Sequence, residues 1–168
     1  MRRTSSSPPP SWQLLPGTLR DVELVRRKCR RLVLKRAALS AGISAVPIPG
    51  LDLVSDLGLM AKAIEEINIE FGLTPEQIAK LKPEMRLVIY EMTVGIGGMM
   101  VGKLITREVV GQLLKKTGFK ALARQTAKIV PLAGQVVSAS IGFATFRAVA
   151  NRHIDACATV AAAALRAS

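Results

Sequence analysis

Apolar residues recur every three or four positions from Thr18 to the C-terminus, and no segment keeps the two-residue period of a strand for long. In residues 18–39 the apolar and charged side chains separate onto two faces of a helix. The apolar face carries Leu19, Val22, Val25, Cys29, Leu32 and Val33. The outer face carries Arg20, Glu23, Arg27, Arg30 and Arg31. This segment is predicted to be a helix with a basic outer face, capped by Thr18 and with Asp21 in its first turn.

A second helix is predicted to begin near Asp52, because residues 51–71 again show the helical period. Its apolar stripe is Val54, Leu57, Ala61, Ile64 and Phe71, and its polar stripe is Asp52, Asp56, Glu66 and Glu70. Gly72 is placed to end it as a C-terminal cap. Thr74-Pro75-Glu76-Gln77 then forms a capping box with proline at the first helical position, and Pro83 begins another helix.

The rest of the chain is predicted to continue as helices, over residues 103–118, 119–128 and 129–167. Residues 129–146 are uncharged and come close to the length of a bilayer span. Polar or helix-breaking residues dilute this stretch: Pro131, Gln135, Ser138, Ser140 and Thr145. We therefore expect a buried helix rather than a span, continued by the alanine-rich residues 147–167.

The predicted fold class is all-α: a compact multi-helix domain over residues 18–168, with turns rich in proline and glycine. One such turn contains Pro47, Pro49 and Gly50, which stop one helix and redirect the next. Residues 1–17 begin with an arginine-, serine- and proline-rich stretch that lacks acids, and they are predicted to form a disordered tail.

Charge is distributed unevenly along the 168 residues, whose formal net charge is +12. The net charge is +8 in residues 1–40, −4 in residues 41–91 and +8 in residues 92–168. This distribution favours either an anionic partner surface or ion pairs between segments. The two cysteines, Cys29 and Cys157, are distant in sequence and are expected to be reduced thiols of an intracellular protein.

Residues 97–103, "GGMMVGK", match the first seven positions of the phosphate-binding loop GxxxxGK[ST]. The eighth position is Leu104, which cannot ligate magnesium, and the preceding residues do not form a buried strand. We instead expect Gly95, Gly98 and Gly102 to form a small-residue face on which helices pack closely. No nucleotide or other cofactor is predicted.

Residues suited to catalysis are few. His153 and Cys157 stand one helical turn apart, as a nucleophile and its base would, but Asp155 lies on a different face. One histidine and two distant cysteines do not make a metal-ligand set. Stacking aromatic motifs typical of nucleic-acid binding are also absent from the sequence. The sequence therefore predicts neither an enzyme nor a nucleic-acid-binding protein.

A basic amphipathic helix is predicted over residues 119–128, where Phe119 and Leu122 share one face and Lys120, Arg124 and Lys128 share another. Such a helix can lie on an anionic membrane surface. The alternative is a surface helix that packs against the core.

Residues 45–81, "AVPIPGLDLVSDLGLMAKAIEEINIEFGLTPEQIAKL", and residues 129–165, "IVPLAGQVVSASIGFATFRAVANRHIDACATVAAAAL", resemble the C-terminal helical domain of the immunity-related, interferon-inducible GTPases and of related bacterial helical-domain proteins. In this resemblance Pro131 and Gly134 form a second turn. The resemblance implies an all-helical domain that in the family packs beside a GTP-binding domain. This chain shows no complete GxxxxGK[ST] loop, so GTP hydrolysis is not expected from it.

The resemblance further implies association with intracellular membranes, on the cytoplasmic face of an organelle or from the cytosol, and contact with a partner GTPase or a second copy of the chain. Two alternatives remain open at this stage. One is a small integral membrane protein with a hairpin of residues 129–146 and 37–51. The other is a fragment of a GTP-binding hydrolase.

Overall fold

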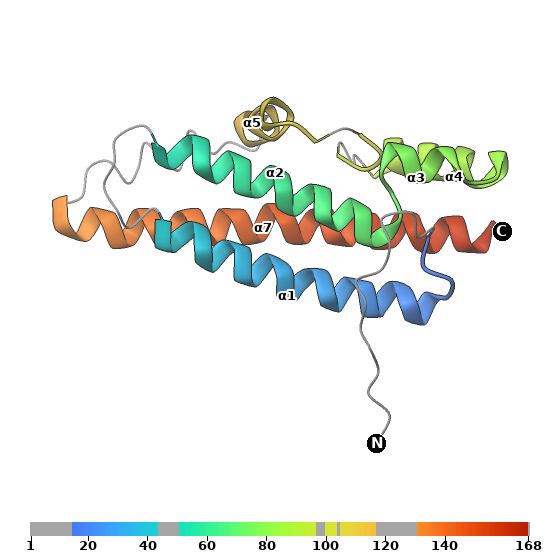
Figure 1. The fold of residues 1–168 in the computed structure, drawn as a ribbon, viewed down its shortest axis with the longest axis horizontal. Coiled ribbons are helices and arrows are strands. Elements are labelled where there is room, and N and C mark those ends of the chain that lie inside the picture. Colours follow the sequence, from blue (N-terminus) through green and yellow to red (C-terminus); the bar gives the residue numbers. More distant parts are fainter. Residues whose placement is uncertain (1–14, 44–50, 97–99, 104, 117–130, 168) are drawn as a thin grey trace, which may run out of the picture.

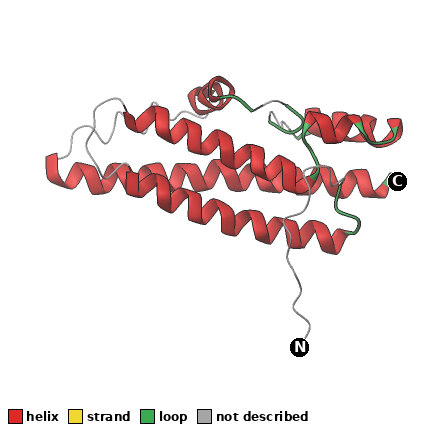
Figure 2. Ribbon diagram, viewed as in Figure 1, coloured by secondary structure: helices red, strands yellow, loops and turns green. Residues whose placement is uncertain are grey.

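The computed structural model describes residues 15–43, 51–96, 100–103, 105–116 and 131–167. Within these ranges the chain forms helices and no strands (Figures 1 and 2). The helices are α1 (Leu19–Ile43), α2 (Leu51–Phe71), α3 (Pro75–Ala79), α4 (Pro83–Gly95), α5 (Arg107–Lys116) and α7 (Pro131–Arg166). The predicted all-α fold class is confirmed.

Helix α7 is the axis of the molecule. It has 36 residues, and α1 and α2 run along its two sides while α4 packs near its C-terminal end (Figure 1). Helix α5 contacts the outer side of α2. At about 1.5 Å per residue, α7 is about 54 Å long, which is long enough to contact the other long helices over most of their length. The predicted continuation of one helix through the alanine-rich C-terminal segment is confirmed.

Local capping signals fix where α1 and α3 begin. The Thr18 hydroxyl accepts a hydrogen bond from the Asp21 backbone N–H at 3.1 Å. At α3, the Gln77 N–H donates to the Thr74 hydroxyl at 3.2 Å and the Thr74 N–H donates to Gln77 Oε1 at 3.1 Å. Pro75 occupies the first turn. Both predicted caps are confirmed, because each satisfies N–H groups that a helix start leaves without partners.

Helix α2 ends as predicted at Gly72, whose φ is 71°. The Leu73 N–H donates to the Asn68 carbonyl at 2.8 Å and the Gly72 N–H donates to the Ile69 carbonyl at 3.1 Å. This pair of bonds is the Schellman arrangement, which needs a left-handed residue after the last turn. The reversal directs Leu73 into the core, where its side chain is fully buried.

The core lies where α1, α2 and α7 meet. Most of the apolar faces predicted for α1 and α2 are buried or partly buried there, and α7 contributes mainly small or branched side chains. Among the described side chains of α7, those in the buried core are Phe146, Ala150, Ile154, Cys157, Ala158, Val160, Ala161 and Ala164. Leu19 was wrongly placed on the inner face of α1, since its side chain is 53% exposed. Its position in the first turn of α1 lies beyond the edge of the core.

The predicted tail needs a correction at its end. Residues 1–14 lie outside the described part of the chain, but Leu15 is half-buried and packs against the core. An apolar side chain that can reach a core is stabilised by burial. The ordered domain therefore includes at least Leu15 of the predicted tail.

The predicted glycine face is also corrected. Gly95 is the last residue of α4, and a Cβ there would meet nothing within 4 Å. Gly102 lies beyond the helix in a turn, with φ of 67°. Gly98 lies outside the described residues. Gly95 and Gly102 therefore do not share a helix face, and the role of Gly102 is to adopt a left-handed backbone conformation.

The second predicted turn is a helix start. Pro131 is the first residue of α7 and Gly134 follows within its first turns. Proline suits this position because its fixed φ is helical and its missing N–H would have no partner in any case. The other predicted turn residues, Pro47, Pro49 and Gly50, lie outside the described residues.

Candidate functional site

A buried polar cluster joins α2 to α7. Asn68, His153 and Cys157 are each almost fully buried. Asn68 Oδ1 lies 2.9 Å from His153 Nε2 and 3.5 Å from Cys157 Sγ, and the Sγ lies 3.4 Å from the same Nε2. The structure thus brings together the histidine and cysteine singled out in the sequence, with Asn68 as a partner that the sequence analysis missed.

The hydrogen bonds of Asn68 determine the protonation of this cluster. Its Nδ2 donates to the Met100 carbonyl at 3.1 Å, so its Oδ1 faces His153 and can only accept. His153 Nε2 must therefore carry a proton. Burial also lowers the pKa of His153 from 6.5 to about 4, so the ring is neutral near pH 7.

This geometry does not suit Cys157 to act as a nucleophile. The protonated Nε2 cannot accept the thiol proton, and burial raises the pKa of Cys157 well above its usual value. Cys29, buried in the same core, also has a pKa raised by burial, to about 12. Asp155 does not join His153 and Cys157, because it accepts hydrogen bonds from Arg26 at 2.7 Å and Arg30 at 3.1 Å. The cluster is therefore suited to holding α2, α7 and the turn at Met100 together.

Ion pairs between α1 and α2 account for part of the uneven charge. Lys28 Nζ lies 2.7 Å from Glu70 Oε2, and Arg36 pairs with Glu66. These contacts show that segments of opposite net charge do meet within the domain. Asp155, by contrast, pairs with Arg26 and Arg30 between two basic segments. Of the α1 cations, Arg20, Arg31 and Lys35 form no ion pair with the described residues.

The solvent side of α1 forms a basic surface with leucines in it. We define the α1 outer face as six exposed residues: Arg20, Leu24, Arg27, Arg31, Leu34 and Lys35. They recur at the three- and four-residue intervals that place side chains on one side of a helix. Leu24 and Leu34 are 55% and 49% exposed, so the basic face also presents apolar side chains to solvent.

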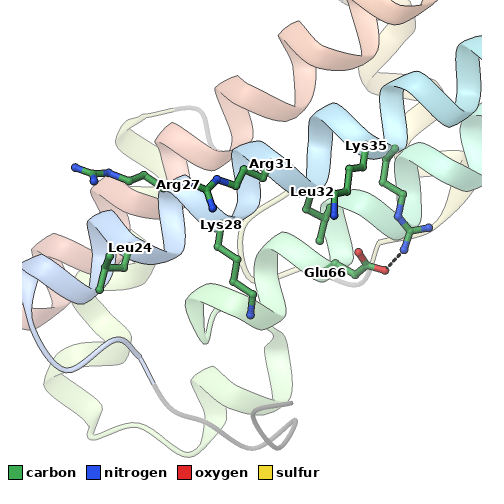
Figure 3. Close-up of a pocket in the computed structure, with 8 residues that line it drawn as sticks. Leu24, Arg27, Lys28, Arg31, Leu32, Lys35 and Glu66 are labelled. Atoms are coloured by element: carbon green, nitrogen blue, oxygen red, sulfur yellow. Dashed lines mark hydrogen bonds and ion pairs between the residues drawn. The ribbon is translucent and has the colours of Figure 1, made fainter. Parts of the chain in front are cut away.

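A groove opens beside this face, between α1 and α2 (Figure 3). Its volume is about 560 Å³. We call it the α1 groove; it is lined by Leu24, Arg27, Lys28, Arg31, Leu32, Lys35, Arg36 and Glu66. Five of these side chains are basic and one is acidic, so the groove favours anions. The four-residue spacing of Arg27, Arg31 and Lys35 is a sequence signal for this arrangement.

A second exposed surface lies on α4. Leu87, Tyr90 and Val94 are 58%, 69% and 65% exposed, and their spacing places them on one side of the helix. The opposite side of α4 packs on the core through Ile89, with Met85 and Met92 partly buried beside it. We call Leu87, Tyr90 and Val94 the α4 stripe. It is an apolar surface for which the described part of the chain supplies no cover.

The predicted membrane-binding residues lie outside the described part of the chain: Phe119, Lys120, Leu122, Arg124 and Lys128. So do Leu104 and Gly97 to Met99 of the glycine-rich segment. Lys103 is described and is exposed after the turn at Gly102. Among the described residues, no three histidine, cysteine or acidic side chains gather as a metal site would require. None of the described helices combines the length and hydropathy that a bilayer span requires.

Fold and surface together define a class: an all-helical domain with a basic groove on one helix and an apolar stripe on another. The chain is similar to interferon-inducible GTPase 5 of Bos taurus, with 29% identity over 115 residues that make up 67% of this chain and 24% of that protein. It is similarly related to interferon-inducible GTPase 5 of Rattus norvegicus, with 28% identity over 115 residues, 67% of this chain and 25% of that protein. The matched part spans about a quarter of these relatives. No family model matches the chain, and no solved structure matches it.

Proposed function

We propose that this chain is a non-catalytic helical domain that binds the anionic surface of an intracellular membrane from the cytoplasmic side. The observation that carries the proposal is the α1 outer face, where four exposed cations surround Leu24 and Leu34. The similarity to part of the interferon-inducible GTPases is consistent with a domain of that kind.

The two sides of α1 have different roles. The inner side of α1 is fully used by the core, through Cys29, Val33 and Ala37. The outer face is left for another surface. Each cation near an anionic bilayer contributes about 1 kcal/mol, and exposed leucines can enter the boundary between headgroups and acyl chains. Because α1 is held rigidly against α7, it needs no folding on binding.

Hydrolysis of GTP forms no part of the proposal, although the relatives are named as GTPases. The described residues of this chain form helices and no strands. The glycine-rich segment follows α4, which is a helix, whereas a phosphate-binding loop follows a strand. The chain is therefore proposed to bind surfaces rather than to turn over nucleotide.

Liposome co-sedimentation tests the membrane proposal. The parent chain should sediment with phosphatidylserine vesicles, less with phosphatidylcholine vesicles, and less as salt is added, because salt screens the charges. The double variant Arg20→Glu/Leu34→Gln changes the α1 outer face without touching the α1 groove, and it should reduce sedimentation at least fivefold. Arg86→Glu/Leu87→Gln makes the same two changes on α4 and should sediment like the parent. Equal sedimentation by both double variants would contradict the proposal.

The segment 119–128 remains the other predicted membrane contact. Lys120→Glu/Arg124→Glu/Lys128→Glu should further reduce binding if that segment lies on the membrane beside α1. The triple variant should keep the helical circular dichroism of the parent. If it sediments as the parent does, those three residues do not contribute to binding, and α1 carries it without them.

A second candidate function is favoured by the α4 stripe. Its apolar side chains suit a protein surface, and we propose a GTPase partner because the matched relatives are named as GTPases. Mixing the chain with purified interferon-inducible GTPase 5 should give a complex in sedimentation velocity. Tyr90→Lys/Val94→Lys should abolish it, while Lys82→Gln/Arg86→Gln should not. Self-association lost in the same variant would instead assign the stripe to a second copy, and no complex of either kind would contradict the candidate.

A further inference from the structure

The α1 groove differs from a general basic face in that some of its cations are already paired and others are not. Lys28 is held by Glu70 at 2.7 Å, and Arg36 is held by Glu66 (Figure 3). Arg31 and Lys35 are exposed and form no ion pair with the described residues. The paired cations fix the wall on the α2 side, and the unpaired ones remain available to a ligand.

The unpaired cations have a defined separation. Arg31 and Lys35 are four residues apart on α1, which places them about 6 Å apart along the helix axis and on the same side. Arg27 lies one turn earlier, and its only ion pair with the described residues is a 3.5 Å contact with half-buried Glu23. The three side chains follow one edge of the groove (Figure 3).

We propose that the α1 groove is a binding site for a small group that carries two or more phosphates. The group is either a phosphorylated lipid headgroup or a free polyphosphate compound. The inference rests on the proposed membrane function only in the choice between these two sources. The groove volume of about 560 Å³ is within the range of small-ligand sites.

Phosphate chemistry fits these side chains better than a single carboxylate does. An arginine guanidinium can donate two parallel hydrogen bonds to one phosphate, and a lysine adds a compact charge to a second. Arg31 and Lys35 therefore engage neighbouring phosphates, and Arg27 adds a third contact one helical turn before Arg31. Leu32, partly buried against the core, forms an apolar floor for the ring or chain that joins the phosphates.

Isothermal titration of the full chain with soluble inositol 1,4,5-trisphosphate tests the site without a membrane. The parent should bind one equivalent saturably, and inorganic phosphate should bind at least tenfold more weakly. Arg31→Gln/Lys35→Gln should weaken binding of the trisphosphate at least tenfold. Lys82→Gln/Arg86→Gln is the matched control, because it removes one lysine and one arginine at the same four-residue spacing. Both are exposed, Lys82 as the N-cap of α4 and Arg86 in its first turn. The control should bind as the parent does.

Two results would overturn the proposal: no saturable binding by the parent, or equal weakening in both double variants, which would indicate only diffuse charge attraction. Vesicles identify the source. A preference for a bisphosphorylated inositol lipid over phosphatidylserine at equal vesicle charge, lost in Arg31→Gln/Lys35→Gln, assigns a lipid headgroup. Trisphosphate binding without that preference assigns a free compound.

The same measurements separate this inference from the proposed membrane function. Trisphosphate binding by a chain that ignores phosphatidylserine vesicles would overturn the membrane function and leave the groove site standing. Salt-sensitive vesicle binding without any trisphosphate binding would do the reverse.

Discussion

Asn68 Oδ1 accepts a hydrogen bond from His153 Nε2 at 2.9 Å, across 85 positions of sequence and between two helices. The same asparagine donates from Nδ2 to the Met100 carbonyl at 3.1 Å. Its side chain therefore connects α2 to α7 and to the turn after α4. Because Asn68, His153 and Met100 are buried, the His153 N–H and the Met100 carbonyl depend on Asn68 to replace the hydrogen bonds that water supplies in the unfolded chain.

Replacing Asn68 with Leu should destabilise the domain by about 1–3 kcal/mol, because the His153 N–H and the Met100 carbonyl lose their partner while remaining buried. Urea unfolding followed by circular dichroism measures this change. The double variant Asn68→Leu/His153→Leu should lose less than the sum of the two single variants, since it removes both polar partners of one bond. Strict additivity would show that the two side chains are not coupled.

Stability should fall between about pH 7 and about pH 5, by about 2 kcal/mol from this one group. Burial lowers the pKa of His153 from 6.5 to about 4. Between those values the unfolded chain binds a proton that the native chain does not, so the stability is complete above pH 6.5 and is lost as the pH falls toward 4. His153 is the only histidine of the sequence, so urea unfolding of His153→Gln should show a much smaller loss. An unchanged pH dependence in that variant would assign the effect to carboxylates.

Gly102→Ala should destabilise the domain by about 1–2 kcal/mol, because an L-residue is strained at positive φ. The φ of Gly102 is 67°, and an added Cβ would lie 3.0 Å from Ile78 Cδ1. Gly95→Ala is the control, since a Cβ there meets nothing within 4 Å. Thermal unfolding should therefore separate the two variants. Similar melting temperatures would restore the interpretation that both glycines have equivalent roles.

Both thiols should resist labelling in the native state. Burial raises the pKa of Cys29 to about 12 and that of Cys157 well above its usual value, and both side chains are buried. Since only the thiolate reacts, a disulfide reagent should modify them no faster than the chain unfolds. Labelling of one cysteine in a folded chain, detected by mass spectrometry, would mean that its surroundings open locally.

The chain should bind no guanine nucleotide with magnesium present. Helix α4 precedes the glycine-rich segment where a phosphate-binding loop requires a strand, and Leu104 replaces the hydroxyl residue that ligates magnesium. Equilibrium dialysis with labelled GTP measures this. Micromolar binding abolished by Lys103→Ala would contradict the prediction.

The features that could be predicted from the sequence are those that depend on interactions between residues close together in the chain. The Thr74–Gln77 box and the cap at Gly72 involve residues within a few positions of each other, so short spacings identify them. The glycines after α4 were assigned to a helix because the sequence there contains no strong stop signal. Their backbone instead turns, and the Gly102 N–H donates to the Leu73 carbonyl at 3.2 Å. That partner lies 29 residues away and no local pattern indicates it.

The candidate site was only partly predictable for the same reason. His153 and Cys157 were identified by their one-turn spacing, but their role depends on Asn68, which comes from another helix. Asn68 had a weak signal, since it lies four residues after Ile64 on the buried side of α2. The basic character of α1 was evident from composition. Which of its cations are already paired depends on the acids of α2 and α7, and only the structure shows that.

The pairing of α1 with α7 also constrains how the domain is made. Arg26 and Asp155, joined at 2.7 Å, are separated by 129 positions, and the apolar side of α1 finds its main cover on α7. A ribosome adds about 5–20 residues per second, so the partner residues of α7 are synthesised on the order of 10 s after α1. During this interval its inner face is exposed to chaperones and to neighbouring nascent chains. Folding of this domain is thus expected to be completed only after α7 has been synthesised and docks between two helices that were made long before it.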